Sequence, residues 1–437
     1  MKIVTNTKSR AVFAIAAVAV LAMSACTTQP STGSADTSTG ATETPTTAAE
    51  PDYSAKLRDA IPTVMTDNAI PGVVVMVQSP SKGDWTSTFG TAELGRDVPI
   101  TVDDYLRIGS NTKTMTSTVI LQLVQEGVLS LDDPISKFRP DVPGGDDITI
   151  ADLSEMRSGL YSYTFDPAFN ATLDAEPQKA WTADELLAIA FSHPANAAPA
   201  QVFDYSNTNI VLLGVVIEQL TGMSASEAFD ERIFSPLGLT HTHLPAPDDS
   251  SIPDTHPQGY QFGTNVDTID SYAVPAAQLP DALSGTLKPL DQTDANPSWA
   301  WTAGGAISTP TDLAVYVKAL VGGGLLDDDT QKLRLDSVQS MSSGSPKGVG
   351  YGLGIAQFAP GIFGHDGQLP GFSSFMAYNL DTGDTIIIGT NLSASPVDGQ
   401  NAAVVVGKSI IGTLYGASDV PGAPAATVPT PTSEAPK

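Results

Sequence analysis

The sequence is poor in basic residues. Its 437 residues contain 21 Lys and Arg against 48 Asp and Glu, so the formal net charge is −27 at pH 7. A protein that binds nucleic acid needs clustered positive charge to neutralise phosphates, and this shortage excludes nucleic acid as an expected partner. Hydrophobic residues still make up 41% of the chain, which is enough for a globular core.

Cysteine and histidine are also scarce. Because Cys26 is the single cysteine, no disulfide can form within the chain. Of five histidines, His241 and His243 lie close together but lack an Asp at metal-site spacing, so two loop histidines are favoured over a metal pair. No Gly-x-Ser-x-Gly elbow, phosphate loop or dinucleotide fingerprint occurs. We therefore expect neither a metal nor a cofactor.

The first 25 residues have the pattern of a signal peptide. An apolar stretch over residues 11–23 follows three basic residues, Lys2, Lys8 and Arg10. The stretch is too short to span about 30 Å of hydrocarbon at about 1.5 Å per residue, but it is typical of an export signal. Residues 23–26 resemble a bacterial lipobox, although Met23 replaces the usual Leu. We expect an exported protein whose lipidated Cys26 anchors it to the outer face of the cell membrane.

The composition divides the rest of the chain into three parts. Residues 26–51 and 416–437 have few large apolar side chains, which predicts a flexible tether and a disordered tail around a folded domain over 52–415. Hydrophobic spacing predicts helices over 53–68, 112–125, 150–156, 183–190, 209–220, 310–320 and 402–415, and strands over 73–78, 85–90, 371–378 and 384–390. The Pro- and Asp-rich segment 245–298 is predicted to form long loops over the helical region. Terminal helices around an antiparallel sheet, with a helical subdomain in between, indicate an α+β fold, an α/β sandwich.

The first chemical motif is Ser110-Asn111-Thr112-Lys113 at the start of a predicted helix. Residues three apart share one helix face, so the lysine can take the proton from the serine if burial lowers its pKa. The backbone N–H at the helix start is free to meet a developing oxyanion. Ser79 and Lys82 have the same spacing but lie in a Pro/Gly turn, where their side chains need not face each other.

Two further motifs follow along the chain. Tyr205-Ser206-Asn207 precedes an apolar helix; a tyrosine hydroxyl can relay a proton, and an asparagine amide can bind a substrate carbonyl and the lysine. Gly364-His365-Asp366-Gly367 precedes the late strands. Glycine on a strand edge permits close approach of a substrate backbone, and a histidine can donate to a carboxylate or a leaving group. Taken singly, each motif is equally compatible with ordinary loop residues.

The order of the three motifs resembles the serine beta-lactamase and D-alanyl-D-alanine carboxypeptidase family, especially its class C and related branch. The segment 107–113 is similar to the family's nucleophile segment. Further similar segments are 129–134, 157–160, 205–214, 304–313 and 351–354. The resemblance therefore covers roughly residues 53–415 and implies a beta-lactamase/transpeptidase-like fold.

The resemblance also implies catalytic roles. Ser110 is expected to attack a carbonyl and become acylated, while Lys113 and Tyr205 share the general base and acid work. The oxyanion hole is expected to consist of the backbone N–H groups of Ser110 and Gln368. The substrate-binding residues implied by the resemblance are Asn207, His365, Gly367, Gln368 and Trp299. His365 stands where many relatives have lysine.

Three departures from the family pattern bear on the substrate. Asp366 occupies the place where carboxypeptidases and class C lactamases have Thr, and it brings an acid to the site. Residues 355–358 lack the Arg that carboxypeptidase members can use to clamp a substrate carboxylate. The water-activating Glu of class A lactamases is not found in the sequence. An efficient lactamase is therefore not expected.

The sequence leaves several functions open. Lipid anchoring outside the membrane favours a D-alanyl-D-alanine carboxypeptidase-like peptidase that acts on peptidoglycan peptides. The departures favour an esterase or amidase of the same family that acts on a small molecule. A non-catalytic penicillin-binding sensor lipoprotein is a third alternative, which the intact Ser110, Lys113 and Tyr205 set disfavours.

Overall fold

The structure of the chain is a computed structural model that describes residues 50–416. The predicted signal peptide, the lipidation site Cys26 and the tether lie outside the described residues, apart from residues 50 and 51. The predicted tail likewise lies outside them from residue 417 onward.

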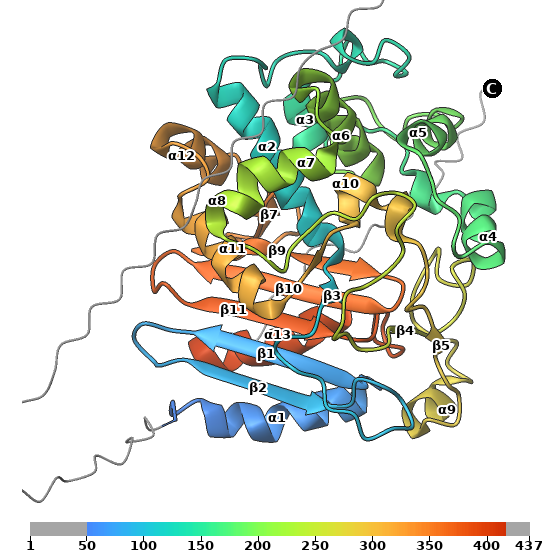
Figure 1. Ribbon diagram of the computed structural model, residues 1–437, viewed down its shortest axis with the longest axis vertical. Coiled ribbons are helices and arrows are strands. Elements are labelled where there is room, and N and C mark those ends of the chain that lie inside the picture. The colour runs from blue at the N-terminus through green and yellow to red at the C-terminus, as the bar shows by residue number, and fades with distance from the viewer. Residues whose placement is uncertain (1–49, 417–437) are drawn as a thin grey trace, which may run out of the picture. The chain divides into compact units, whose positions relative to one another are not determined.

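A seven-stranded antiparallel sheet forms the centre of the fold (Figure 1). Its strands, in spatial order, are β2 (Trp85–Gly90), β1 (Gly72–Gln78), β11 (Thr385–Thr390), β10 (Phe372–Asn379), β9 (Ile362–Leu369), β8 (Ala356–Ala359) and β7 (Gly350–Tyr351). The N-terminal hairpin joins the C-terminal strands where β1 pairs with β11, with Val73 opposite Thr390. Two short pairs lie outside this sheet: β3 (Leu106–Arg107) with β6 (Ile307–Ser308), and β4 (Tyr260–Gln261) with β5 (Leu290–Asp291).

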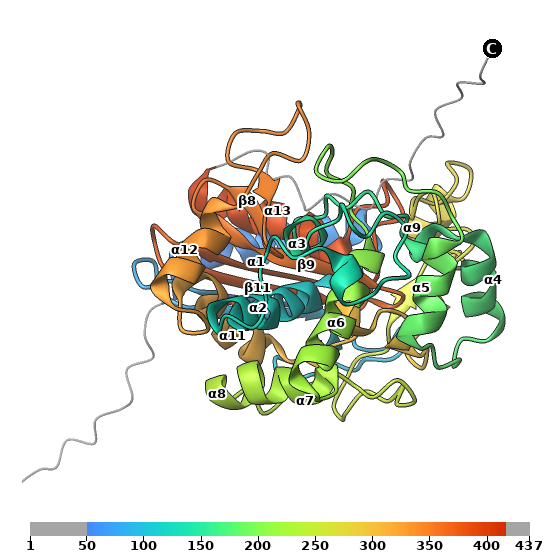
Figure 2. The ribbon, with the colours of Figure 1, turned by 90° about the horizontal axis from the view of Figure 1, so that it is seen from above.

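Helices cover both faces of the sheet. They are α1 (Ser54–Asp67), α2 (Thr112–Gln125), α3 (Ile150–Ser154), α4 (Pro167–Ala175), α5 (Ala183–Phe191), α6 (Asn207–Thr221), α7 (Ala225–Phe229), α8 (Ser235–Leu237), α9 (Leu279–Ser284), α10 (Trp301–Gly304), α11 (Pro310–Gly322), α12 (Asp328–Asp336) and α13 (Ala402–Tyr415). The terminal helices α1 and α13 pack together on one face, and α11 packs on the other, on the same side as α2 and α6 (Figure 2). The predicted α+β fold, with terminal helices and a helical subdomain, is confirmed.

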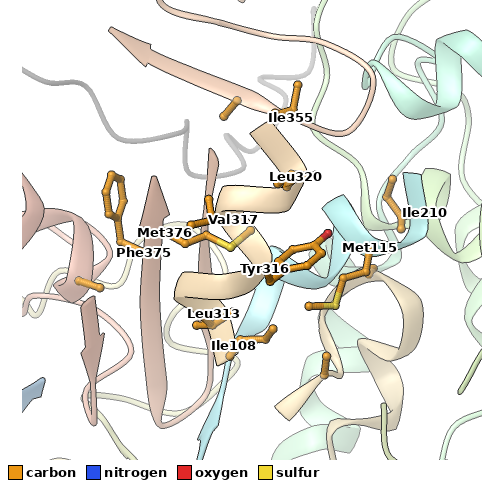
Figure 3. Packing of buried hydrophobic residues seen from close by; sticks show 14 of the residues in the cluster. Ile108, Met115, Ile210, Leu313, Tyr316, Val317, Leu320, Ile355, Phe375 and Met376 are labelled. Carbon is orange, nitrogen blue, oxygen red and sulfur yellow. The ribbon is translucent and has the colours of Figure 1, made fainter. Parts of the chain in front are cut away.

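The main core extends over both faces of the sheet, and one part of it lies between the sheet and α2. Tyr316, Val317 and Leu320 of α11 lie between Met376 of β10 and Met115 of α2 (Figure 3). The hydroxyl of Tyr316 also lies 2.8 Å from the Thr114 hydroxyl, which ties α11 to α2. Successive strand residues face opposite sides. The residue before Met376 on β10, Phe375, therefore faces the terminal helices.

Helix α2 is buried on nearly all sides. Eleven of its fourteen residues are buried, and a helix covered all round belongs to the centre of a domain. Several of its threonines bond backbone carbonyls: the Thr116 hydroxyl donates to the Thr302 carbonyl at 2.7 Å, and the Thr118 hydroxyl to the Thr114 carbonyl at 2.6 Å. This helix is a rigid support for Ser110, which lies two residues before its first residue.

Two differences from the sequence-based expectation bear on the site. Strand β9 was not predicted, because its glycines and polar residues have low strand propensity; pairing with β10 over its whole length defines it. The segment 245–298 does not lie only over the helical region. The Tyr260 N–H bonds the carbonyls of Gly371 and Asn391 at 3.0 Å, so the segment also closes one end of the sheet.

Within residues 50–416, no single helix is long and apolar enough to cross a membrane; α6 and the helical stretch 225–237 pass that test only as a pair bent by 82°.

Candidate active site

Ser110 and Lys113 lie at the junction between a short 3-10 helix, η1 (Gly109–Asn111), and α2. The Lys113 ammonium nitrogen Nζ lies 2.9 Å from Ser110 Oγ, as the spacing of the two residues predicts. Ser110 is partly exposed, whereas Lys113 is fully buried. The hydroxyl is therefore open to a substrate, and the amine behind it is shielded from water.

Two more oxygens surround the amine of Lys113. Nζ donates to Asn207 Oδ1 at 2.7 Å and to the Ala303 carbonyl at 2.6 Å. Burial lowers the pKa of Lys113 to about 7, although the nearby carboxylate of Asp366 acts in the opposite direction. A substantial fraction of Lys113 is then neutral near pH 7 and able to accept a proton. Ala303 had no signal in the sequence, because its contribution is a backbone carbonyl from α10.

Tyr205 directly precedes Ser206, which is the N-cap position of α6. Its ring lies beside the lysine, with 5.0 Å from Lys113 Nζ to the ring centroid. Burial raises the pKa of Tyr205 far above its usual range, with a smaller opposing effect from Ser110. The phenol is therefore neutral, which suits a group that passes a proton on without holding a charge.

Asn207 is fixed from both sides. Its backbone N–H donates to Ser162 Oγ at 3.1 Å, and its side-chain Nδ2 donates to Thr164 Oγ1 at 3.3 Å. Because Nδ2 is directed to Thr164, the amide oxygen faces Lys113. Thr164 was not predicted, since the short 3-10 helix that contains it, Tyr163–Phe165, has no recognisable sequence pattern.

His365 lies on β9 behind the site. Burial lowers the pKa of His365 to about 3, so the ring is neutral and carries one N–H. Nδ1 lies 2.6 Å from the Asp366 carbonyl and is the donor there; Nε2 therefore accepts from the Tyr351 hydroxyl at 3.0 Å. Both ring nitrogens are engaged within the protein. In this structure His365, which was expected to bind substrate, contacts the β9 backbone and Tyr351, and it is not among the described residues that line the cavity in front of Ser110.

Glycines let η1 pack directly on β9. A Cβ on Gly367 would lie 1.9 Å from the Ile108 carbonyl oxygen, and one on Gly109 would lie 2.4 Å from the backbone nitrogen of Gln368. Gly109 also has φ +53°, which favours glycine. This close approach places Gly109, the residue before Ser110, against the backbone of Gln368.

A cavity of about 490 Å³ opens in front of Ser110. Tyr205, Asn207, Asp366 and Gln368 lie around the nucleophile, and Trp299 is part of the wall. The remaining lining residues come from 164–173, from 265–272 and from Pro370, Asp398 and Gly399. The segment 265–272 was expected as loop alone, and its place in the wall follows from the tertiary structure.

Asn401 connects the site to the last helix. It is the N-cap residue of α13, and its Oδ1 accepts from the Val404 N–H at 3.1 Å. Its Nδ2 donates to the Gly367 carbonyl at 2.8 Å and to Asp366 Oδ2 at 3.2 Å. The sequence signal is an N-cap asparagine before an apolar helix, which predicts the cap but not the contact with β9.

The second Ser-x-x-Lys motif has a structural role. Ser79 Oγ donates to Asp384 Oδ1 at 2.5 Å, and Lys82 Nζ lies 2.8 Å from Asp384 Oδ2. Both side chains bind Asp384 and do not contact each other, so they fix the turn between β1 and β2 to that residue. Within residues 50–416, no group of three or more His, Cys, Asp or Glu side chains could hold a metal ion.

The sheet and its flanking helices, with Ser110 and Lys113 in contact at the start of α2, define a protein with a beta-lactamase/transpeptidase-like fold. The chain belongs to the Beta-lactamase family, whose model matches residues 57–408.

Several solved structures and relatives resemble this chain. A D-stereospecific amidohydrolase from Streptomyces sp. is 32% identical with a TM-score of 0.69, covering 84% of this chain and 100% of that one. The D-amino acid amidase from Ochrobactrum anthropi SV3 is 27% identical with a TM-score of 0.67, covering 82% and 97%. Protein flp of Staphylococcus aureus (strain N315) is 25% identical over 336 residues, which are 75% of this chain and 61% of that protein. The chain thus spans less than two thirds of the length of this relative.

Proposed function

We propose that this protein is a serine amidohydrolase that cleaves amides or short peptides of D-amino acids through an acyl-enzyme on Ser110. The observation that carries the proposal is the 2.9 Å contact between Ser110 Oγ and Lys113 Nζ at the base of an open cavity. The similarity to the D-stereospecific amidohydrolase over that protein's full length supports the substrate class.

The proposed reaction begins with proton transfer from Ser110 Oγ to neutral Lys113, while Oγ attacks the substrate carbonyl carbon. The negative charge on the carbonyl oxygen is met by the N–H groups of Ser110 and Gln368. Tyr205 gives its proton to the leaving nitrogen and recovers one from Lys113. The C–N bond breaks, and the acyl group remains as an ester on Ser110.

Deacylation runs through the same groups in reverse. Water attacks the ester carbonyl and gives its proton to the Lys113 and Tyr205 pair, and the pair returns a proton to Ser110 Oγ as the acid leaves. The net reaction is hydrolysis of an amide to an acid and an amine, and the enzyme is regenerated. Asn207, which contacts Lys113 Nζ at 2.7 Å, keeps the amine in place through both steps.

The cavity favours the amidase over the carboxypeptidase. A peptide that ends in D-alanyl-D-alanine carries a terminal carboxylate, which is best bound by a cationic side chain. No Lys or Arg is among the described residues that line the cavity, and Asp366 is one of them. The following experiment distinguishes the amidase from the three alternatives: a D-alanyl-D-alanine carboxypeptidase, an esterase and a non-catalytic sensor.

The test compares turnover and acylation in the wild type, Ser110→Ala and the matched control Ser79→Ala. The substrates are D-phenylalaninamide, an acylated peptide ending in D-Ala-D-Ala, and a short p-nitrophenyl ester; intact mass after penicillin G reports the adduct. We expect amide hydrolysis that Ser110→Ala lowers by at least about 10³-fold and that Ser79→Ala retains, since Ser79 lies in the β1–β2 turn.

Each outcome points to one function. Hydrolysis of the D-Ala-D-Ala peptide without that of the amide would support the carboxypeptidase, and hydrolysis of the ester alone would support an esterase. A penicillin adduct without any turnover would support the sensor. Full activity in Ser110→Ala would exclude the acyl-enzyme mechanism altogether.

We also propose that the hydrolase works outside the cell membrane, held there by a lipid on Cys26. The proposal rests on the basic and apolar pattern of residues 1–25 and on the lipobox-like residues 23–26. Metabolic labelling of the full chain with a radioactive fatty acid is expected to mark the wild type and not Cys26→Ala. Equal labelling of both would contradict it.

A further inference from the structure

The substrate cavity carries acids but no bases. Asp270, Asp366 and Asp398 line it, whereas no Lys, Arg or His of the described chain does so. Asp270 and Asp398 are exposed at the rim, and Asp366 is only partly exposed, on β9 between the paired residues His365 and Gly367. A concave surface of one charge sign concentrates the opposite charge in its interior.

Asp366 is incompletely satisfied by the protein. Its Oδ2 accepts a single long hydrogen bond, 3.2 Å from Asn401 Nδ2. Its Oδ1 is buried and has no hydrogen-bond partner among the described residues. A buried polar atom without a partner is costly in native structures, so Asp366 keeps unused hydrogen-bonding capacity in the wall of the cavity.

The electrostatics agree with the geometry. Burial raises the pKa of Asp366 to about 7, and the positive charge of Lys113 offsets this effect only in part. Lys113 gives its three donors to Ser110, Asn207 and Ala303, so it does not pair with Asp366. A cation that enters the cavity would stabilise the ionised carboxylate.

The apolar part of the wall limits the size of the ligand. Phe165, Phe169, Leu173 and Trp299 line the same cavity of about 490 Å³, and Phe169 packs against Trp299 with 6.2 Å between ring centroids. This wall suits a large apolar side chain. The cavity thus combines an aromatic surface, a nucleophile and an unpaired acid.

We infer that Asp366 is a specificity residue that binds an ammonium group of the substrate next to its scissile carbonyl. The protein then selects amides or peptides of apolar amino acids with a free amino group, and it discriminates against N-acylated or carboxylate-bearing analogues. The inference rests on the proposed function for the reaction, but the ligand preference can be measured without turnover.

The experiment measures binding by titration calorimetry in Ser110→Ala, which cannot turn over the ligand. The two ligands are D-phenylalaninamide and N-acetyl-D-phenylalaninamide, which differ in the ammonium group. The second variant adds Asp366→Asn, which removes the charge and keeps the shape, and the matched control adds Asp398→Asn, which removes a rim charge from the same cavity.

We expect the free amine to bind about 10- to 100-fold more tightly than the acetylated ligand in Ser110→Ala, as a charge-assisted contact provides. With Asp366→Asn added, the free amine is expected to bind at most about 3-fold more tightly than the acetylated ligand. With Asp398→Asn added, the ratio of the two affinities should stay within about a factor of 3 of its value in Ser110→Ala alone. Because each ratio compares two ligands on one protein, a general loss of affinity does not affect it.

Equal affinity for the two ligands in Ser110→Ala would overturn the inference, and so would a preference that survives Asp366→Asn. A lack of binding of the free amine at millimolar concentration would overturn it as well. If the wild type hydrolyses no amide but the preference depends on Asp366, the proposed reaction fails and the inference stands. If Asp366→Asn does not fold, the comparison of ligands on the parent still decides the preference.

Discussion

Lys113 shows how one side chain acquires its chemistry from burial. It is fully buried and contacts a hydroxyl, an amide oxygen and a backbone carbonyl. None of these groups is an anion, so no direct partner compensates for the loss of water. Burial therefore dominates, and it lowers the pKa of Lys113 to about 7, close to the value that suits a general base at neutral pH.

A pH profile tests this role. With a neutral ester as substrate, we expect kcat/KM to be low at pH 5, to rise through about pH 7 as Lys113 loses its proton, and to reach a plateau at higher pH. Asp366→Asn should move the midpoint to lower pH, because the negative charge of Asp366 raises the pKa of Lys113.

The control for the pH profile is Asp398→Asn, which removes a charge at the cavity rim and should leave the midpoint within about 0.3 units. A rate independent of pH between 5 and 9 would contradict Lys113 as the base. A midpoint that moves upward in Asp366→Asn would contradict the coupling of the two groups.

At the scale of secondary structure, the site depends on contacts of β9 with its neighbours. Strand β9 supplies Asp366 and Gln368 to the cavity, while His365 faces inward to Tyr351. The start of α13 holds β9 in place through Asn401, which binds the Gly367 carbonyl at 2.8 Å. A helix cap therefore also positions the strand that borders the nucleophile.

Two cap substitutions separate these functions. Asn401→Ala removes the cap of α13 and the donors to β9, so we expect a loss of about 1–3 kcal/mol in the free energy of unfolding and at least a 10-fold drop in kcat. Asp327 caps α12, because its Oδ1 accepts from the Thr330 N–H at 2.8 Å. For Asp327→Ala we expect a loss of about 1 kcal/mol in the free energy of unfolding and an unchanged kcat.

Urea unfolding and steady-state kinetics on both variants make this comparison. A similar kcat in the two variants would show that Asn401 acts as a cap alone. A larger fall in stability for Asp327→Ala than for Asn401→Ala would contradict the assigned contacts.

At the scale of the whole molecule, charge is the dominant property. With a formal net charge of −27, the protein attracts cations over distances that salt controls, since the Debye length is about 8 Å at physiological ionic strength. The three carboxylates that line the cavity lie within this acidic molecule. Long-range attraction therefore adds to the local effect of Asp366 for a cationic substrate.

Salt dependence follows from this charge. Raising NaCl from about 0.05 to 0.5 M is expected to lower kcat/KM for a cationic amide by about 3- to 10-fold and to leave that for a neutral ester within about 2-fold. Initial rates at several salt concentrations provide the measurement. An equal fall in kcat/KM for both substrates would indicate a general effect of salt on the protein, and it would contradict electrostatic attraction of the cationic substrate.

The sequence by itself determined the features that depend on neighbours along the chain. Helices α2 and α13 were predicted with the ends that the structure gives them, because hydrophobic spacing is a local property. The approach of Lys113 to Ser110 followed from their separation by three residues on one helix. The family resemblance extended this to Tyr205, Asn207 and Trp299, which the structure brings to the same cavity or to Lys113.

Only the tertiary structure decided the features that depend on distant segments. Strand β9 exists because β10 and η1 pair and pack with it, and its own residues favour a strand weakly. The engagement of His365 by Tyr351, the carbonyl of Ala303 at Lys113 and the unpaired oxygen of Asp366 likewise have no local signal. The physical reason is that burial and hydrogen bonding, which set the pKa values of Lys113 and Asp366, are created when segments far apart in the sequence exclude water together.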